Sequence, residues 1–199
     1  MQTNCEQDNS ARSLIEQAAT GDSYSFRLLV NEFSGYAYNL ACKTLFDKDE
    51  AKDVVQESFI RVWKHLKNYK PEIKFTTWLY TIVVNLCYDK IKADKRKARM
   101  FESFGDDKTD MMEMKSLSME DVISNNDMLR IIELLSRELS KKQRMVFVLR
   151  DLQNLSVEET SQILNISSGA VKTNLFNARK FIAGKLSGLE RKENKHEVR

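Results

Sequence analysis

The sequence predicts an all-α protein, in which two small helical domains are joined by a flexible acidic linker. The 199 residues include only six glycines and one proline, too few turn formers for a sheet protein. Apolar residues make up 42% of the chain and recur at the three- and four-residue intervals of amphipathic helices. This proportion is high enough to form a packed core.

The first expected helices lie between residues 22 and 66. Residues 22–46 form one amphipathic helix or two helices joined near Gly35. The next helix has Asp47 or Asp49 as its N-terminal cap and an apolar stripe that includes Trp63. A polar face lies opposite this stripe.

Pro71 then breaks the chain in the loop over residues 68–74. A third helix begins at Phe75 and runs into a basic stretch that ends at Arg99. Trp78 lies on the apolar stripe of this helix. We therefore interpret it as a core residue rather than a stacking platform, and Phe75 likewise.

The charge is distributed unevenly along the chain. Residues 1–99 have a net charge of +3 (16 basic minus 13 acidic), residues 100–127 of −6 (2 minus 8) and residues 128–199 of +6 (14 minus 8). Two basic lobes favour a polyanionic partner, although a solvated charged surface explains charge alone equally well. The expected parts are a first domain over residues 1–97, an acidic, methionine-rich linker over residues 98–127 and a second domain over residues 128–199.

Helical periodicity returns at Met128, with one helix up to Leu139 and another around residues 146–149. Two further helices follow from Val157. The tail from Leu189 is charged and we expect it to fray.

The last two of these helices have the layout of a helix-turn-helix. Ser156 and Glu159 have the spacing of a capping box, and Asn165 occupies the left-handed turn between the helices. Ser167 or Ser168 caps the second helix. Its outward side chains are cationic or hydrogen-bonding, which suits a DNA major groove, while a helical hairpin with a solvated face is the alternative.

Several classes of function are not expected. The N-terminus is polar and acidic and lacks a signal peptide, and no apolar stretch is long enough to span a membrane, so we expect a cytoplasmic protein with no membrane insertion. The three cysteines and two histidines lack metal-site spacing. No nucleophile, base and orienting group converge and no glycine-rich phosphate loop is present, so we expect no enzyme, catalytic residue, cofactor or metal.

Two segments resemble a known family. The runs DEAKDVVQESFIRVW, residues 49–63, and FTTWLYTIVVNLCYDKIK, residues 75–92, resemble conserved region 2 of bacterial sigma factors. The helix-turn-helix resembles their region 4. Both motifs occur in the expected order with one short linker, which is similar to the extracytoplasmic-function (ECF) class of the sigma-70 family. The resemblance implies a promoter-specificity subunit that binds core RNA polymerase, recognises −10 and −35 promoter DNA and helps to open it.

The resemblance also implies roles for individual residues. Core polymerase would dock on the polar face of the second helix, and the loop and third helix would hold the −10 element as a single strand. The implied polymerase-binding residues are Asp53, Gln56, Glu57 and Arg61. The implied −10 residues are Tyr69, Lys70, Lys74, Asn85, Lys90, Lys92 and Arg96.

For the −35 element, the resemblance assigns the outward face of the last helix and one residue before the helix-turn-helix. Asn174 and Asn177 stand where arginine is frequent in the family. Because asparagine pairs bidentately with adenine and arginine with guanine, we expect a −35 sequence that differs from the family's best-known one. The implied −35 residues are Arg150, Lys172, Thr173, Phe176, Asn177 and Arg179.

The resemblance further implies an anti-sigma factor as a partner and a linker that threads polymerase channels, where its negative charge would mimic nucleic acid. One alternative is a helix-turn-helix transcriptional regulator that acts without core polymerase. Another is a helical interaction protein with no nucleic-acid role. The polar face of the second helix and the aromatic, asparagine-bearing third helix favour the sigma factor over both.

Overall fold

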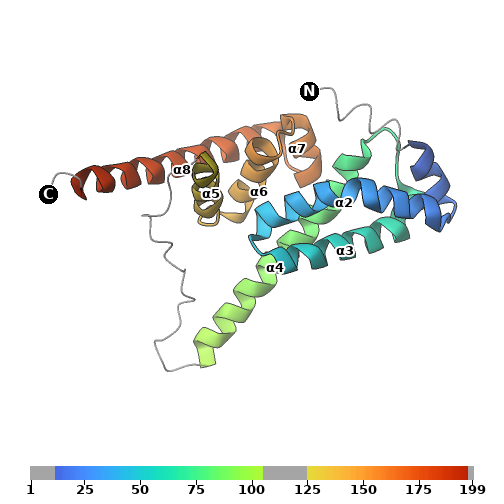
Figure 1. Ribbon diagram of the computed structural model, residues 1–199, viewed down its shortest axis with the longest axis horizontal. Helices are drawn as coiled ribbons and strands as arrows, with labels where there is room; N and C mark the ends of the chain where they lie inside the picture. The colour runs from blue at the N-terminus through green and yellow to red at the C-terminus, as the bar shows by residue number, and fades with distance from the viewer. Residues whose placement is uncertain (1–11, 105–124, 197–199) are drawn as a thin grey trace.

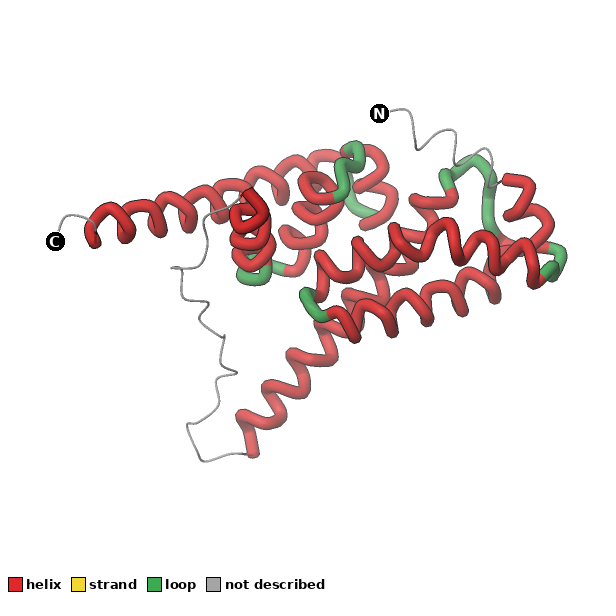
Figure 2. The backbone as a smooth tube through the Cα atoms, in the orientation of Figure 1, coloured by secondary structure: helices red, strands yellow, loops and turns green. Residues whose placement is uncertain are grey.

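The computed structural model describes residues 12–104 and 125–196, and the regular elements in these stretches are all helices (Figures 1 and 2). The first stretch contains a helix over residues 12–19, α2 (Ser23–Leu45), α3 (Lys48–His65), a 3₁₀ turn (Leu66–Asn68) and α4 (Phe75–Phe104). The second contains α5 (Asn125–Ser136), α6 (Lys141–Phe147), a π-helical turn (Val148–Leu152), α7 (Val157–Leu164) and α8 (Ser168–His196). Within these stretches, no helix combines the length and apolar character needed to cross a membrane.

Helices α2, α3 and α4 pack around one apolar core (Figure 1). Leu29, Phe33, Val54, Leu79 and Val83 are all buried in it. Full burial of each such side chain stabilises the fold by about 1.5–3 kcal/mol. The apolar stripes expected from the sequence therefore meet at the centre of this bundle.

Caps define where these helices begin. The Asp47 carboxylate accepts the backbone N–H groups of Asp49 and Glu50, so Asp47 and not Asp49 caps α3. Helix α2 continues without a break through Gly35. Of the two arrangements that the sequence left open for residues 22–46, the single helix is correct.

The helix-turn-helix formed by α7 and α8 has the expected caps. The Ser156 hydroxyl accepts the Glu159 N–H at 3.0 Å, and the Glu159 carboxylate accepts the Ser156 N–H at 2.9 Å, which completes the capping box. Asn165 is in the left-handed region with φ 50° and ψ 51°. The Ser167 hydroxyl accepts the Ala170 N–H at 3.2 Å, which identifies Ser167 as the cap of α8.

The two halves of the chain pack against each other, with α7 lying along α4. Met145, Val148, Leu149 and Ile163 of the second half belong to the same buried cluster as the α2–α4 core. Polar contacts reinforce this packing: the Lys43 ammonium donates to the Leu152 carbonyl at 3.0 Å, and Arg137 Nη2 donates to the Phe46 carbonyl at 3.0 Å.

Two expectations about the chain outside the bundle differ from the structure. Helix α4 continues to Phe104, so residues 98–104 of the expected linker are helical. Helix α8 continues past Leu189 to His196 instead of fraying there. Residues 98–104 include alanine, arginine, methionine and glutamate, and residues 189–196 are mostly lysine, arginine and glutamate. These residue types have high helix propensity and allow an existing helix to propagate. Residues 105–124 of the expected linker lie outside the described residues.

Candidate functional site

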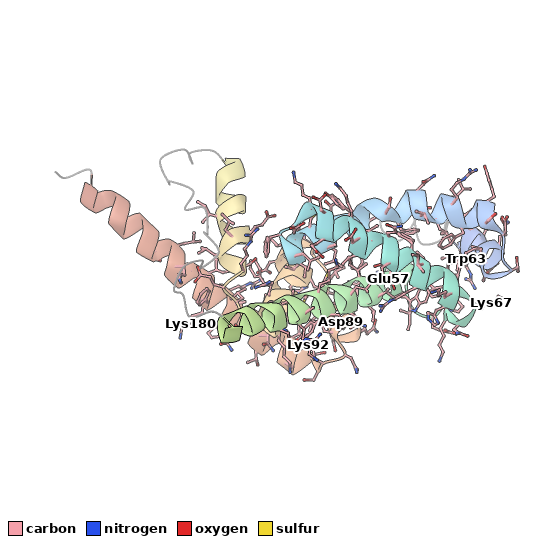
Figure 3. The ribbon with its side chains drawn as sticks, turned by 90° about the horizontal axis from the view of Figure 1, so that it is seen from below. Glu57, Trp63, Lys67, Asp89, Lys92 and Lys180 are labelled. Atoms are coloured by element: carbon pink, nitrogen blue, oxygen red, sulfur yellow. The ribbon has the colours of Figure 1, made fainter. Side chains whose placement is uncertain are left out.

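The polar face of α3 is accessible along most of its length. Asp53 and Gln56 are exposed, while Glu57 and Arg61 are half-buried and joined by an ion pair of 2.9 Å between Arg61 Nε and Glu57 Oε1. Figure 3 shows Glu57 on this helix. The four residues therefore lie on one helix as a ridge of two carboxylates, one amide and one guanidinium that a partner could contact.

An open apolar groove of about 810 Å³ lies between α2 and α3, and Gln56 of the ridge also lines it. Trp63 is 40% exposed in this groove, with its ring centroid 4.7 Å from that of Phe26 on α2. Ile60 is 42% exposed beside it. Apolar side chains that remain this accessible next to a polar ridge form a surface suited to an amphipathic helix.

The periodicity of the sequence predicts Trp63 on the apolar stripe of this helix, and it does not predict the groove. The stripe of α3 is wider than α2 and α4 together can cover, which leaves its outer edge at the surface. One signal was present in the sequence: Lys52 and Gln56 share the row of Phe59 and Trp63 at four- and three-residue spacing. A row that mixes polar and large apolar residues indicates the edge of a core rather than its centre.

The loop before α4 lies over a group of aromatic rings. The Tyr69 hydroxyl donates to the Ile73 carbonyl at 2.5 Å, and the Tyr69 ring centroid lies 5.3 Å from that of Trp78. Phe75 is 1% exposed and Trp78 is half-buried, in agreement with their interpretation as core residues. Lys70 is exposed in the loop.

Two of the expected −10 residues face the second half of the chain. The Lys74 ammonium lies 2.9 Å from Glu159 Oε1, so the loop is paired with the capping box of α7. Although burial disfavours its charged form, hydrogen bonds from Ser156 and Lys74 hold the pKa of Glu159 below its usual value. Asn85 is exposed and lines a cleft of about 200 Å³ whose opposite wall includes Leu164 and Ile166.

The three α4 cations expected at the −10 element fall into two groups. Lys90 forms an ion pair with Glu50 and lies 3.6 Å from Asp53, both on α3, and the hydrogen bond to Glu50 raises the pKa of Lys90. Lys92 and Arg96 are exposed, and Figure 3 shows Lys92 projecting from α4. Lys90 therefore joins two helices, whereas the other two cations are accessible to phosphate.

Helix α8 exposes most of the expected −35 residues on one face. Lys172, Thr173, Phe176 and Asn177 are exposed, with Phe176 at 66%. Val171, Leu175 and Ala178 are buried on the opposite face.

The remaining two −35 candidates have partners within the chain. Arg179 Nε and Nη2 contact the Asp151 carboxylate at 2.8 and 2.6 Å in a bidentate pair, and this hydrogen bonding raises the pKa of Arg179. Arg150 Nη1 donates to the Leu155 carbonyl, and its Nε is buried without a hydrogen-bond partner in the structure. Both side chains therefore stabilise the turn before α7, which the sequence did not indicate.

Comparisons with known proteins agree with this arrangement. Residues 29–97 match the family described as sigma-70 region 2, and residues 129–182 match sigma-70 region 4. The chain is 32% identical to the ECF RNA polymerase sigma factor SigW of Bacillus subtilis over 181 residues, which cover 88% of this chain and 96% of SigW. It is 30% identical to the ECF RNA polymerase sigma-E factor of Escherichia coli K12 over 190 residues, 90% of this chain and 95% of that relative.

Solved structures have the same fold. CnrH, solved in complex with the cytosolic domain of CnrY, matches 89% of this chain and 97% of its own with a TM-score of 0.64 and 25% identity. The sigma factor RpoE from Bartonella quintana, solved with the anti-sigma factor NepR, matches 81% of this chain and 96% of its own with a TM-score of 0.61 and 19% identity. The chain therefore belongs to the ECF class of RNA polymerase sigma factors, the subunits that give RNA polymerase its promoter specificity.

Proposed function

We propose that this sigma factor docks on core RNA polymerase through α3 and directs initiation by contacting the −10 element with its first half and the −35 element with its second. The observation that carries the proposal is the presence, in one chain, of a polar ridge beside an apolar groove on α3 and an exposed recognition face on α8. The proposed domains are residues 1–97 and 128–199, joined by the acidic segment over residues 98–127.

The proposed polymerase contact combines apolar and polar surface. Trp63 and Ile60 provide accessible apolar area in the groove, and Asp53, Gln56 and Glu57 provide acceptors for a basic partner. A hydrophobic centre with a polar rim is the usual composition of a specific protein interface. The charged ridge would set the orientation of the partner and the rate of association.

For the −10 element, the structure supports a smaller phosphate-binding set than the sequence resemblance implies. Lys92 and Arg96 are accessible for the backbone of a single strand, and Lys70 extends from the loop that would border a flipped base. Lys90 would act indirectly in this proposal, by fixing α4 to α3 through Glu50. Tyr69, Lys74 and Asn85 complete the proposed pocket.

Asn85 provides a test of strand opening. The family resemblance implies that Asn85 lies by the pocket of the −10 element, and its side chain is exposed in the cleft between α4 and the second half of the chain. Asn85→Ala should therefore impair open-complex formation more than binding to duplex promoter DNA. The measurement compares holoenzyme activity on duplex templates and on templates with a premelted −10 region. A defect of equal size on both templates would contradict a role in opening.

For the −35 element, the proposed readers are the exposed residues of α8 rather than the two internally bonded arginines. Lys172→Ala should weaken −35 binding by about 1–3 kcal/mol if the side chain reads a base pair. Arg179 and Arg150 would orient the helix-turn-helix. A phosphate that either side chain bound would contact a guanidinium that is already bonded, to Asp151 in the case of Arg179 and to the Leu155 carbonyl in the case of Arg150.

We further propose that an anti-sigma factor regulates the chain, that the chain acts in the cytoplasm and that it has no catalytic activity of its own. The groove on α3 would accept an apolar helix from such a regulator as well as one from polymerase, so the two partners would compete. The negative charge of the segment over residues 100–127 would keep it away from promoter DNA and favour polymerase channels that bind nucleic acid.

The decisive experiment is in vitro transcription from a promoter library by purified core polymerase, with and without the full-length chain. Chain-dependent transcripts that share −10 and −35 motifs would support the proposal. Gln56→Ala with Glu57→Ala should reduce affinity for core polymerase, and Lys172→Ala should leave that affinity unchanged while reducing transcription. A regulator that acts without polymerase would bind duplex DNA but show no affinity for core.

A further inference from the structure

Two asparagines, Asn174 and Asn177, lie three residues apart on α8, and the structure gives them different environments. The Asn174 Nδ2 group donates to the Ala170 carbonyl at 2.8 Å, and the residue is half-buried at the edge of the face that packs on the core. Asn177 is exposed, and its side chain makes no hydrogen bond or ion pair with any other described residue. The same side chain is therefore held by its own helix at one position and accessible at the other.

This difference decides which amide can read a base. An asparagine that recognises adenine uses its amide N–H and its carbonyl oxygen together, on adenine N7 and N6. The bond to Ala170 holds the half-buried Asn174 side chain against its own helix, so turning both amide groups toward a groove would require this side chain to leave that position. Asn177 has both groups available.

The position of Asn177 on the helix supports the same assignment. Thr173 lies one turn before it and Lys180 one turn after it, and both are exposed. The row that contains Asn177 is thus accessible over two turns, and it faces away from buried Leu175 and Ile182. A helix inserted into the major groove would present this row to consecutive base edges.

We infer that Asn177, and not Asn174, selects adenine at one position of the −35 element through a bidentate contact in the major groove. This inference rests on the proposed function, because it requires α8 to enter the groove at the −35 element. It adds to the proposed function a base preference that is set by the Asn177 side chain.

The test uses holoenzyme assembled from core polymerase and the full-length chain, and a promoter library randomised at the −35 element with the −10 element fixed. Wild-type enzyme should enrich adenine at one position. Asn177→Ala should reduce that enrichment by about tenfold, the discrimination expected of one bidentate pair. The preferences at other positions should persist.

Two matched variants distinguish base reading from a structural role. Asn177→Arg should move the preference at the same position from adenine to guanine, which loss of stability could not do. Asn174→Ala removes a bond within the helix and should leave the adenine preference in place. Thermal unfolding of each variant reports whether the helix-turn-helix is intact.

Four other outcomes would contradict the inference. An adenine preference that survives Asn177→Ala, or one that is lost in Asn174→Ala with the fold intact, would overturn the inference and leave the proposed function standing. A wild-type enzyme that shows base preferences within the −35 element, but no position that prefers adenine, would do the same. No chain-dependent transcript from any template would overturn the proposed function and this inference with it.

Discussion

The ion pair between Lys74 and Glu159 connects the two halves of the chain, and its contribution to their packing can be measured. Glu159→Gln removes the charge but keeps a glutamine at the capping-box position, which still accepts the Ser156 N–H. Lys74→Met removes the charge of the other residue in the pair and keeps a side chain of similar length. Because Lys74 makes a further interaction, a double-mutant cycle is needed to isolate this pair.

The magnitude follows from the distance and exposure of the pair. Unit charges 2.9 Å apart attract by about 1.4 kcal/mol at the dielectric constant of water. The Lys74 side chain is 46% exposed and that of Glu159 is 23% exposed, so solvent screening and lost side-chain entropy reduce the net value. We expect a coupling of about 0.5–1 kcal/mol. If the two halves separate and repack in solution, this changes the ratio of separated to packed molecules about two- to fivefold.

Single-molecule energy transfer measures this ratio directly, with dyes placed at two exposed residues, Lys67 in the 3₁₀ turn after α3 and Lys180 on α8. The coupling should decrease as salt is raised. Since the folded pKa of Glu159 is lowered, the contribution is complete above the ordinary value of 4.5 and is lost as the pH falls through the folded pKa. Additive effects of the two substitutions at low salt would show that the pair does not connect the halves.

Three further predictions concern separate parts of the molecule. Trp63→Ala should weaken binding to core polymerase by about 2 kcal/mol or more, as truncation of an interface tryptophan often does, without changing affinity for an isolated −35 duplex; equal losses in both assays would contradict this. Leu29→Ala should lower the free energy of unfolding by about 2–5 kcal/mol in urea titrations, because the side chain is fully buried. Ser156→Ala should cost about 1 kcal/mol in the same measurement through loss of the cap, and an unchanged midpoint would mean that the box is not formed in solution.

Local signals in the sequence were sufficient for most of the fold. The capping box at Ser156 and the left-handed Asn165 are decided by interactions within a few residues, so both could be predicted from spacing alone. The ends of α4 and α8 could not be predicted, because residues of high helix propensity extend a helix that packing has already nucleated. The helix over residues 12–19 was not predicted either, since its apolar pattern is short.

Prediction of the site was limited by contacts between residues far apart in sequence. Lys90 and Arg179 look equally available for phosphate in the sequence, yet Glu50 and Asp151, at separations of 40 and 28 residues, pair with them. The pairing of Lys74 could not be predicted for the same reason, because its partner Glu159 is 85 residues away. Exposed cations without such a partner, such as Lys172, lie where the periodicity placed them.

The ion pair at Lys90 also affects how substitutions on α3 should be interpreted. Asp53 belongs to the proposed polymerase-binding ridge and lies 3.6 Å from the Lys90 ammonium. Asp53→Ala would therefore remove a polymerase contact and also weaken the attachment of α4, which carries the −10 residues. Gln56 has no such link to α4 among the described contacts, so a polymerase-binding defect in Gln56→Ala identifies docking itself. A −10 defect that appears in Asp53→Ala but not in Gln56→Ala would then measure the contribution of the α3–α4 ion pair to promoter opening.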